Sequence, residues 1–408
     1  MTGKLNIAVA GAGVAGLASA LYLHSLGHAV CVIDRFEKSQ PLGSGLMLQP
    51  TGLTVLHDLG LSDRIFALGN RIDRLVGQDS RSGRNVLDVS YETQRTARFG
   101  LAVHRAALFD VLHDAVCQAG IEFVLGCEVD AFKLTEHGIS LPTVQPERDF
   151  DLIVDATGAS SKLRPVNVPG GVRGPLQYGA LWTTLNWEDC GFDPHALQQR
   201  YDKASIMIGI LPIGRQVQGG QQKAALFWSL KHSDVDNVRA AGLDRWKAGV
   251  RKYWPEIAPF LDQIRDFDEL STANYGHHTM KQPFAKRIVH VGDSAHSTSP
   301  QLGQGANMAL LDAAALAKAV ERSSSLDSAL ELYGSSRKWH VKVFQFLSLA
   351  LTPFYQSDSI VIPAVRDILM NTVGRTPQMQ RVLSAMISGT LVDPFSAIEL
   401  AEKRFEAG

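Results

Sequence analysis

The chain has 408 residues, enough for two domains that each bury a substantial core. Hydrophobic residues make up 45% and charged residues 20%, and a net charge of −1 gives no electrostatic reason to expect nucleic acid or an acidic membrane surface as a partner. The four cysteines include no Cys-x-x-Cys pair, so we expect free thiols and no structural zinc. No apolar run approaches the roughly 20 residues that span a bilayer, so we expect no transmembrane segment and a cytoplasmic location.

The N-terminal residues predict a strand, a helix and a second strand. Residues 5–10 (LNIAVA) form the short apolar run of a strand buried on both faces. Residues 14–26 carry apolar side chains at helical spacing, and residues 29–34 (AVCVID) return to a strand. A unit of this size is typical of a parallel βαβ crossover.

The remaining elements suggest that a second domain is inserted into the first. We expect a helix over 105–119, strands over 121–125 and 151–158, short β-rich runs over 178–275, a strand over 287–292, a helix over 304–321, and from 326 onward helices broken by Pro353, Pro363 and Pro377. The β-rich runs predict an antiparallel or mixed sheet with one face on a ligand or the core. Because the nucleotide-binding pattern resumes after them, the nucleotide domain is expected to be discontinuous.

A glycine motif stands between the first strand and the first helix. It reads Gly-Ala-Gly-Val-Ala-Gly over residues 11–16. Gly11 permits a tight turn, Gly13 lets the backbone approach a pyrophosphate, and Gly16 allows close packing of helix on strand. Asp34 ends the second strand, where a carboxylate can accept hydrogen bonds from ribose hydroxyls. The motif predicts dinucleotide binding, but it does not distinguish FAD from NAD.

A second motif favours FAD. Residues 292–313 read GDSAHSTSPQLGQGANMALLDA and directly follow a predicted buried strand. Asp293 is placed at the strand end, where it can bind a ribityl hydroxyl. The run 303–307 (GQGAN) opens a long helix, whose N–H groups and positive dipole end could stabilise negative charge on a reduced flavin ring.

Together these motifs resemble the flavoprotein aromatic hydroxylases, the group A flavin-dependent monooxygenases related to p-hydroxybenzoate, salicylate and ubiquinone-biosynthesis hydroxylases. The resemblance covers nearly the whole chain, including GSGLMLQPTGLTVLHDLGL (43–61), HRAALFDVL (104–112), DATGASSKLR (155–164) and the helical C-terminal run. It implies an α/β fold in which a Rossmann-like FAD-binding domain of the GR2 type holds an inserted mixed or antiparallel β-sheet substrate domain and precedes a C-terminal helical tail. The expected divisions are 1–75, 100–170 and 280–350 for the FAD-binding domain, 76–99 and 171–279 for the substrate domain, and 351–408 for the helical region.

The resemblance also implies roles for individual residues. Arg105 matches an arginine that contacts FAD, and Pro300 would lie beside the flavin ring on the face where oxygen reacts. The expected cofactor-binding residues are Gly11, Gly13, Val14, Ala15, Gly16, Asp34, Arg35, Arg105, Val129, Asp293, Gly303, Gly305, Ala306 and Asn307. We interpret His296 as structural. No metal site is expected, because His277 and His278 lack a third ligand.

The implied reaction transfers hydride from NAD(P)H to FAD, and a flavin C4a-hydroperoxide then delivers oxygen to a small aromatic or cyclic substrate. Members of the family have an Asp where this chain has Thr157, and that Asp takes part in the binding of FAD and NAD(P)H. Threonine keeps a hydrogen-bonding oxygen but lacks the charge. Asp155, two residues earlier, could substitute for it. The alternatives are a reductase or dehydrogenase, a monooxygenase reduced by a separate partner, and a non-catalytic FAD-binding regulator.

The substrate is expected on the inserted sheet, near Pro300. Tyr178, Trp182 and Trp228 are candidate pocket residues there, because aromatic side chains hold a flat ring by burial. The expected partners are the small substrate and O2, without nucleic acid, and the chain is expected to be a monomer or homodimer. The sequence leaves open hydroxylation, Baeyer–Villiger oxidation or epoxidation, and the identity of the substrate.

Overall fold

The computed structural model describes residues 3–38, 44–93, 98–136, 138–144, 148–164 and 176–405. Gly43, the first residue of the run 43–61, lies outside the described residues, as do the expected domain limits at 170–171 and at the C-terminus.

The first sheet has six strands in the order β18-β19-β12-β1-β2-β8. Its strands are β1 (Asn6–Ala10), β2 (Ala29–Ile33), β8 (Glu122–Val124), β12 (Leu152–Asp155), β18 (Phe284–Ala285) and β19 (Ile288–His290). All neighbours pair in parallel except β18 with β19. The expected βαβ unit is confirmed, and β1 is apolar and buried from Ile7 to Ala10 because it is central and covered on both faces.

Helices cover one face of this sheet, and a small sheet covers the other. Helices α1 (Val14–Ser25), α4 (Arg105–Gln118) and α9 (Gly305–Arg322) share a core with Ile7 and Val9 of β1. Strands β9 (Lys133–Leu134), β10 (Ile139–Ser140) and β11 (Asp149–Phe150) pack on the face that presents Ala8. The strand expected over 151–158 ends at Asp155, because the chain turns into a loop where Gly158 has a φ of 88°.

The second large sheet is mixed, as expected, with the order β17-β13-β16-β15-β14-β5-β6. Its strands are β5 (Arg74–Asp79), β6 (Asn85–Ser90), β13 (Tyr178–Asn186), β14 (Ala196–Asp202), β15 (Ile206–Arg215), β16 (Gln222–Lys231) and β17 (Ser271–Ala273). Only β14 and β5 pair in parallel.

One face of this sheet is covered by helices that the β-rich pattern over 178–275 did not predict. They are α5 (Val235–Ala241), α6 (Leu243–Tyr253) and α7 (Ala258–Asp262), with short 3-10 turns at His232–Asp234, Pro255–Ile257 and Phe267–Glu269. Trp246 and Val250 of α6, one helical turn apart, are buried against the sheet.

A three-stranded sheet lies between the two large ones. It consists of β3 (Gly45–Leu48), β7 (Gly100–His104) and β4 (Asn70–Ile72), in the order β3-β7-β4. Strand β7 contacts β15, and β3 contacts α9. Helices α2 (Pro50–Asp58) and α3 (Ser62–Phe66) follow β3.

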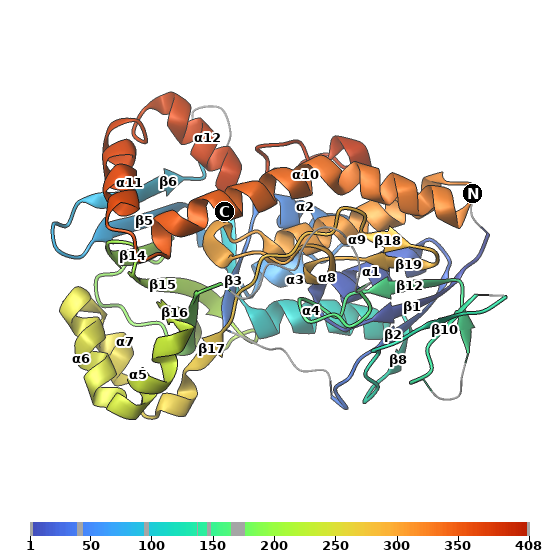
Figure 1. The fold of residues 1–408 in the computed structure, drawn as a ribbon, viewed down its shortest axis with the longest axis horizontal. Helices are drawn as coiled ribbons and strands as arrows, with labels where there is room; N and C mark the ends of the chain where they lie inside the picture. The colour runs from blue at the N-terminus through green and yellow to red at the C-terminus, as the bar shows by residue number, and fades with distance from the viewer. Residues whose placement is uncertain are drawn as a thin grey trace.

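The C-terminal part is helical and joins both halves of the molecule. Helix α10 (Leu326–Tyr355) extends along the top from the six-stranded sheet to the seven-stranded one, where α11 (Val361–Thr372) and α12 (Pro377–Ile387) contact β6 (Figure 1). The short helices α8 (Asp293–His296), η4 (Pro300–Leu302) and η5 (Ser396–Ile398) complete the chain.

Two of the expected proline breaks are wrong. Pro353 lies inside the last turn of α10, and Pro363 lies in the first turn of α11. A proline costs little in the first turn, where its missing N–H has no partner, and near a C-terminus it removes a single hydrogen bond. Only Pro377 begins a helix as expected.

Candidate functional site

A pocket of about 420 Å³ opens at the carboxyl ends of the parallel strands. Its walls come from the loops that follow β1, β2, β12 and β19 and from the first turns of α4 and α9. This is the edge where doubly wound sheets bind ligands, because the loops diverge there.

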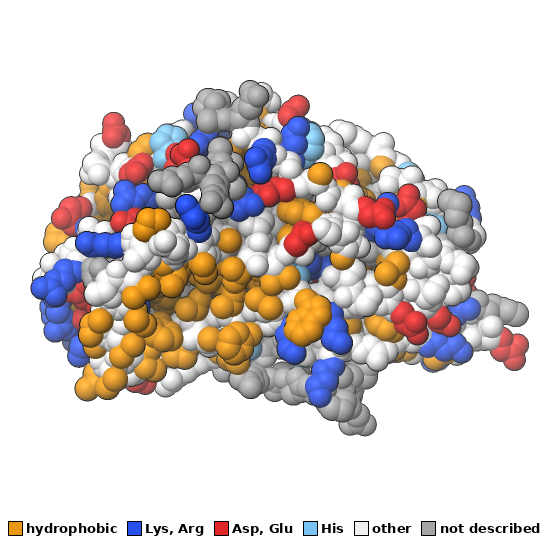
Figure 2. Space-filling view, turned by 90° about the horizontal axis from the view of Figure 1, so that it is seen from above, with side chains coloured by type: hydrophobic (Ala, Val, Ile, Leu, Met, Phe, Trp, Pro, Cys, Tyr) orange, Lys and Arg blue, Asp and Glu red, His pale blue; other side chains and the backbone are white. Residues whose placement is uncertain are grey.

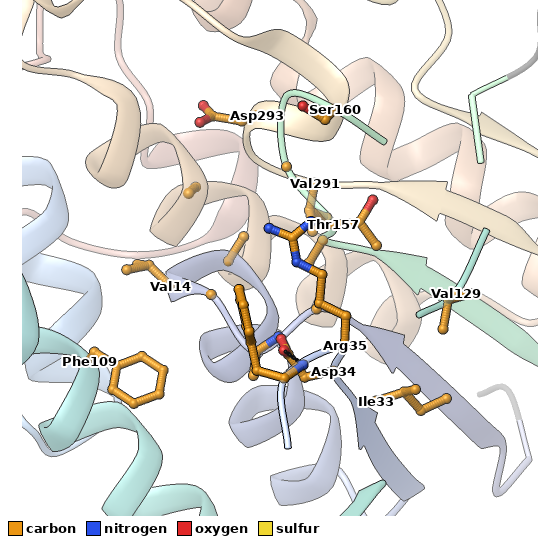
Figure 3. A pocket seen from close by; sticks show the side chains of 18 of the residues that line it. Val14, Ile33, Asp34, Arg35, Phe109, Val129, Thr157, Ser160, Val291 and Asp293 are labelled. Carbon is orange, nitrogen blue, oxygen red and sulfur yellow. Dashed lines mark hydrogen bonds between the residues drawn. The ribbon is translucent and has the colours of Figure 1, made fainter. Parts of the chain in front are cut away.

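Most of the expected cofactor-binding residues line this pocket. They are Gly11, Gly13, Val14, Ala15, Asp34, Arg35, Arg105, Val129, Asp293, Gly305 and Ala306. In Figure 3 the side chain of Arg35 projects into the pocket, with Phe109 and Asp293 at its border.

Three expected residues do not line it. A Cβ on Gly16 would lie 1.9 Å from the carbonyl oxygen of Gly11, so Gly16 permits the contact of α1 with the glycine loop. Gly303 has a φ of 60° and ends the turn η4. The buried Asn307 amide accepts from the backbone N–H of Gln49 at 2.8 Å and donates to the carbonyls of Met47 and Gly303, so it ties α9 to β3.

The glycine loop is open to a ligand at the point where a pyrophosphate would bind. Gly11 has a φ of 104°, and a Cβ on Gly13 would meet no atom within 4 Å, so this side of the backbone faces the cavity. Helix α1 has no side-chain cap, which leaves its first N–H groups available to an anion. The Asp34 carboxylate accepts from the backbone N–H groups of Ala12 at 2.7 Å and Phe36 at 3.0 Å, and so holds the loop against β2.

The other end of the pocket has the same character. Gly305 begins α9 with no side-chain cap, and a Cβ there would also meet nothing within 4 Å. Two uncapped helix N-termini and two open glycines therefore face one cavity, an arrangement that fits the pyrophosphate and the flavin of FAD.

Arg105 and Asp293 both line this pocket. The Asp293 carboxyl group is open to the cavity but enclosed by protein, and this burial raises its pKa, although the charges of His296 and Arg105 oppose the effect. Arg105 is the first residue of α4, where the helix dipole disfavours a cation. Its position is therefore better explained by an anionic or polar ligand than by helix stability.

Thr157 lines the pocket, but Asp155 does not. Asp155 is fully buried, and its carboxylate accepts hydrogen bonds from Thr157, Ser161 and His290, the last at 2.7 Å. Burial raises the pKa of Asp155, but these hydrogen bonds and the charge of His290 outweigh it and leave the pKa lowered. Asp155 therefore cannot replace the family aspartate at the pocket surface.

His296 lies in a buried network behind the flavin motif, in agreement with a structural role. Its Nε2 lies 2.6 Å from Oδ2 of Asp312, which also accepts from the backbone N–H of Gly292. Arg337 of α10 donates to the second oxygen of Asp312 and to His340, whose Nε2 donates to the carbonyl of Gly389. The network connects the flavin motif to the C-terminal region.

The seven-stranded sheet turns one face toward this end of the pocket. Trp182 lies on that face, and its indole N–H donates to the hydroxyl of Tyr275 at 2.8 Å. Two residues along β13, Thr184 hydrogen-bonds the hydroxyl of Ser44, whose carbonyl accepts from the backbone N–H of Arg105. This face of β13 therefore adjoins Arg105.

The other two candidate aromatic residues lie elsewhere. Trp228 pairs with Leu181 rather than Trp182, and it packs against Trp246 of α6 on the opposite face, so its expected place over the flavin is wrong. Tyr178 shares the face of Trp182, but its hydroxyl donates to Asp358 near the end of α10.

Several pocket residues were missed by sequence reasoning. Phe109 and Ala309 follow Arg105 and Gly305 by four residues on α4 and α9, so helical spacing could have found them. Lys162 and Glu128 form an ion pair of 2.9 Å at the pocket wall. No periodic signal marks these two.

Within the described ranges, no group of three or more His, Cys, Asp or Glu side chains is placed to hold a metal ion. Among the same residues, no helix has both the length and the apolar composition needed to cross a bilayer.

Comparisons with known proteins agree in placing the chain in one family. The model of the family described as "FAD binding domain" matches residues 4–344. The FAD-dependent urate hydroxylase of Klebsiella pneumoniae subsp. pneumoniae is 26% identical over 339 residues, which cover 81% of this chain and 85% of the relative. The 3-hydroxybenzoate 6-hydroxylase of Polaromonas naphthalenivorans is 24% identical over 398 residues, covering 92% and 93%.

Among solved structures, Klebsiella pneumoniae HpxO complexed with FAD and uric acid superimposes with a TM-score of 0.79 at 19% identity. The match covers 95% of this chain and 97% of that one, and supports the fold. The chain thus belongs to the FAD binding domain family and is an FAD-dependent monooxygenase of the group A flavoprotein aromatic hydroxylases.

Proposed function

We propose that this monooxygenase hydroxylates a small aromatic or heterocyclic ring bound between the seven-stranded sheet and the flavin end of the pocket. The observation that carries the proposal is the hydrogen bond between Thr184 and Ser44, whose carbonyl accepts from the backbone N–H of Arg105 at the pocket. It places Trp182, two residues along the same face of β13, on the side that adjoins Arg105. Relatives act on urate and on 3-hydroxybenzoate, which supports a planar ring as the substrate.

The side chains have separable roles in this proposal. Bound FAD would supply the redox chemistry, with NAD(P)H as the electron donor typical of the family. The N–H groups of α1 and Asp34 would hold the pyrophosphate and ribose, and Asp293 the ribityl chain. Arg105 and the N-terminus of α9 would stabilise negative charge on the flavin ring.

The substrate side would contain both apolar and polar groups. Trp182 would cover the ring of the substrate, and the Tyr275 hydroxyl, which accepts from Trp182, keeps a proton to donate. Burial raises the pKa of Tyr275 to about 12, so it is a donor at neutral pH. Pro300, at the start of η4, would close the oxygen side.

We also propose the division into domains expected from the sequence, a monomeric or homodimeric state, a cytoplasmic location and the absence of a nucleic-acid partner.

Thr157 favours a second candidate function, a monooxygenase that receives electrons from a separate reductase, because the pocket lacks the family carboxylate at that point. Reduction of the purified holoenzyme by NADH or NADPH alone distinguishes the two.

Substitutions on the two faces of the sheet test the substrate site. Trp182→Phe and Tyr275→Phe should raise KM for the substrate and the fraction of NAD(P)H oxidation that ends in hydrogen peroxide, with FAD content unchanged. Trp228→Phe, on the opposite face, is the matched control and should leave both unchanged. Equal coupling in all three variants and the wild type would place the substrate elsewhere.

A further inference from the structure

Helix α11 presents an apolar side to solvent. It contacts β6 and α10 with its inner side, while its outer side and N-terminus carry Ile360, Val361, Val365, Ile368, Leu369 and Val373, here called the α11 face. Ile360 is 70% exposed and Ile368 64%. Contiguous apolar surface of this kind usually marks an interaction site, because single exposed apolar residues are common and clusters are not.

The apolar surface continues onto neighbouring helices. Phe346 and Trp339 on α10 and Val382 on α12 are also exposed. Figure 2 shows hydrophobic side chains gathered over the end of the molecule that holds α11 and α12, with Lys and Arg side chains along the border. Exposed Trp and Phe beside basic residues are typical of helices that lie in a membrane interface.

Basic side chains accompany the apolar surface. Residues 336–392 contain six Lys or Arg and two Asp, but Arg337 and Arg366 are buried and paired with Asp312 and Asp367, so they add no free charge to the surface. Lys338, Lys342 and Arg375 of this segment are exposed. The exposed charge of the segment that carries the apolar surface is therefore mainly basic.

We propose that the α11 face docks on the surface of an anionic lipid bilayer. Its apolar side chains would enter the interface, and the basic residues would face the lipid head groups. A second copy bound through the same face would instead bring the exposed Lys338, Lys342 and Arg375 of two chains together. The inference does not depend on the proposed function.

Vesicle co-sedimentation of the holoenzyme tests the proposal. The wild type should bind vesicles of equimolar phosphatidylglycerol and phosphatidylcholine, bind pure phosphatidylcholine much more weakly, and lose binding as salt is raised. Ile368→Glu should weaken binding to the anionic vesicles by about tenfold or more, because it removes buried apolar area and adds repulsion. Val217→Glu, at a position 60% exposed in the β15–β16 turn, is the matched control and should bind like the wild type.

The charge contribution has its own control. Lys338→Gln with Lys342→Gln should weaken binding, whereas Lys4→Gln with Lys133→Gln, which changes the charge equally outside the segment, should not. FAD content and circular dichroism establish that each variant is folded. No binding by the wild type, or equal binding by Ile368→Glu, would overturn the proposal. So would a vesicle-free dimer that Ile368→Glu dissociates and Val217→Glu preserves, since that result assigns the face to a second copy.

Discussion

Replacing Gly13 by valine should remove FAD without unfolding the protein. Gly13 has a φ of −78°, which any residue can adopt, and a Cβ there meets no protein atom within 4 Å. The cost in unfolding free energy should therefore be about 1 kcal/mol, the usual penalty for a poor N-cap residue. The valine side chain would instead occupy the space in which the pyrophosphate meets the N–H groups of α1. Losing two hydrogen bonds to a charged group costs about 3–6 kcal/mol, which raises the Kd for FAD at least about 100-fold.

The assay is fluorescence titration of the apoprotein with FAD, together with urea unfolding of the same apoprotein. Gly16→Val provides the contrast, because its Cβ would lie 1.9 Å from the Gly11 carbonyl and the variant should lose several kcal/mol of stability, about 3 or more. If Gly13→Val binds FAD with the wild-type Kd, or unfolds as readily as Gly16→Val, the account of the glycine loop is refuted.

Three further outcomes are expected. Thr157→Asp should destabilise the protein by about 1–3 kcal/mol in urea unfolding and slow the reduction of FAD, because it replaces a 2.6 Å hydrogen bond to Asp155 by two adjacent carboxylates. Faster reduction of FAD in this variant would show that the missing family carboxylate limits electron transfer in the wild type. Burial and the charge of Arg337 lower the pKa of His340 to about 3. The contribution of neutral His340 to the free energy of unfolding should therefore be complete above about pH 6.5 and decline by up to about 1.4 kcal/mol per pH unit down to about pH 3. Acid titrations of stability that coincide for the wild type and His340→Gln would contradict this expectation. Arg105→Gln should slow the reduction of bound FAD while leaving thermal stability near the wild-type value, and a large drop in Tm would show that Arg105 is structural.

The parts of the fold that sequence predicted are those with a strong local signal. Strand β1 is apolar from Ile7 to Ala10 because both of its faces are covered there, and α9 is a long apolar helix opened by glycine. Helix α6 was missed because only Trp246 and Val250 are buried on it, and its other residues resemble a polar loop. Pro353 was misleading, because the cost of a proline depends on its distance from the helix end.

The site could be predicted where the motif fixes the backbone, and less well where tertiary register decides. The ligand-binding role of Gly13 and Gly305 can be predicted from motif spacing alone, because a ligand approaches the backbone at positions that have no side chain. Whether Trp182 or Trp228 lies on the face of the sheet that adjoins Arg105 depends on the alternation along β13 and β16, which a shift of one residue would reverse. Asn307 has the sequence position of a ligand contact, yet its amide is fully used within the protein.

The central claim is that this chain inserts one atom of O2 into a ring. The most direct measurement supplies the holoenzyme with NAD(P)H, isotopically labelled O2 and a panel of aromatic and heterocyclic compounds that includes urate and 3-hydroxybenzoate, and analyses the products by mass spectrometry. The account predicts at least one hydroxylated product that carries a single labelled oxygen atom, formed in step with NAD(P)H oxidation. Hydroxylated product whose oxygen comes from water, or NAD(P)H oxidation that yields only hydrogen peroxide with every compound, would contradict it.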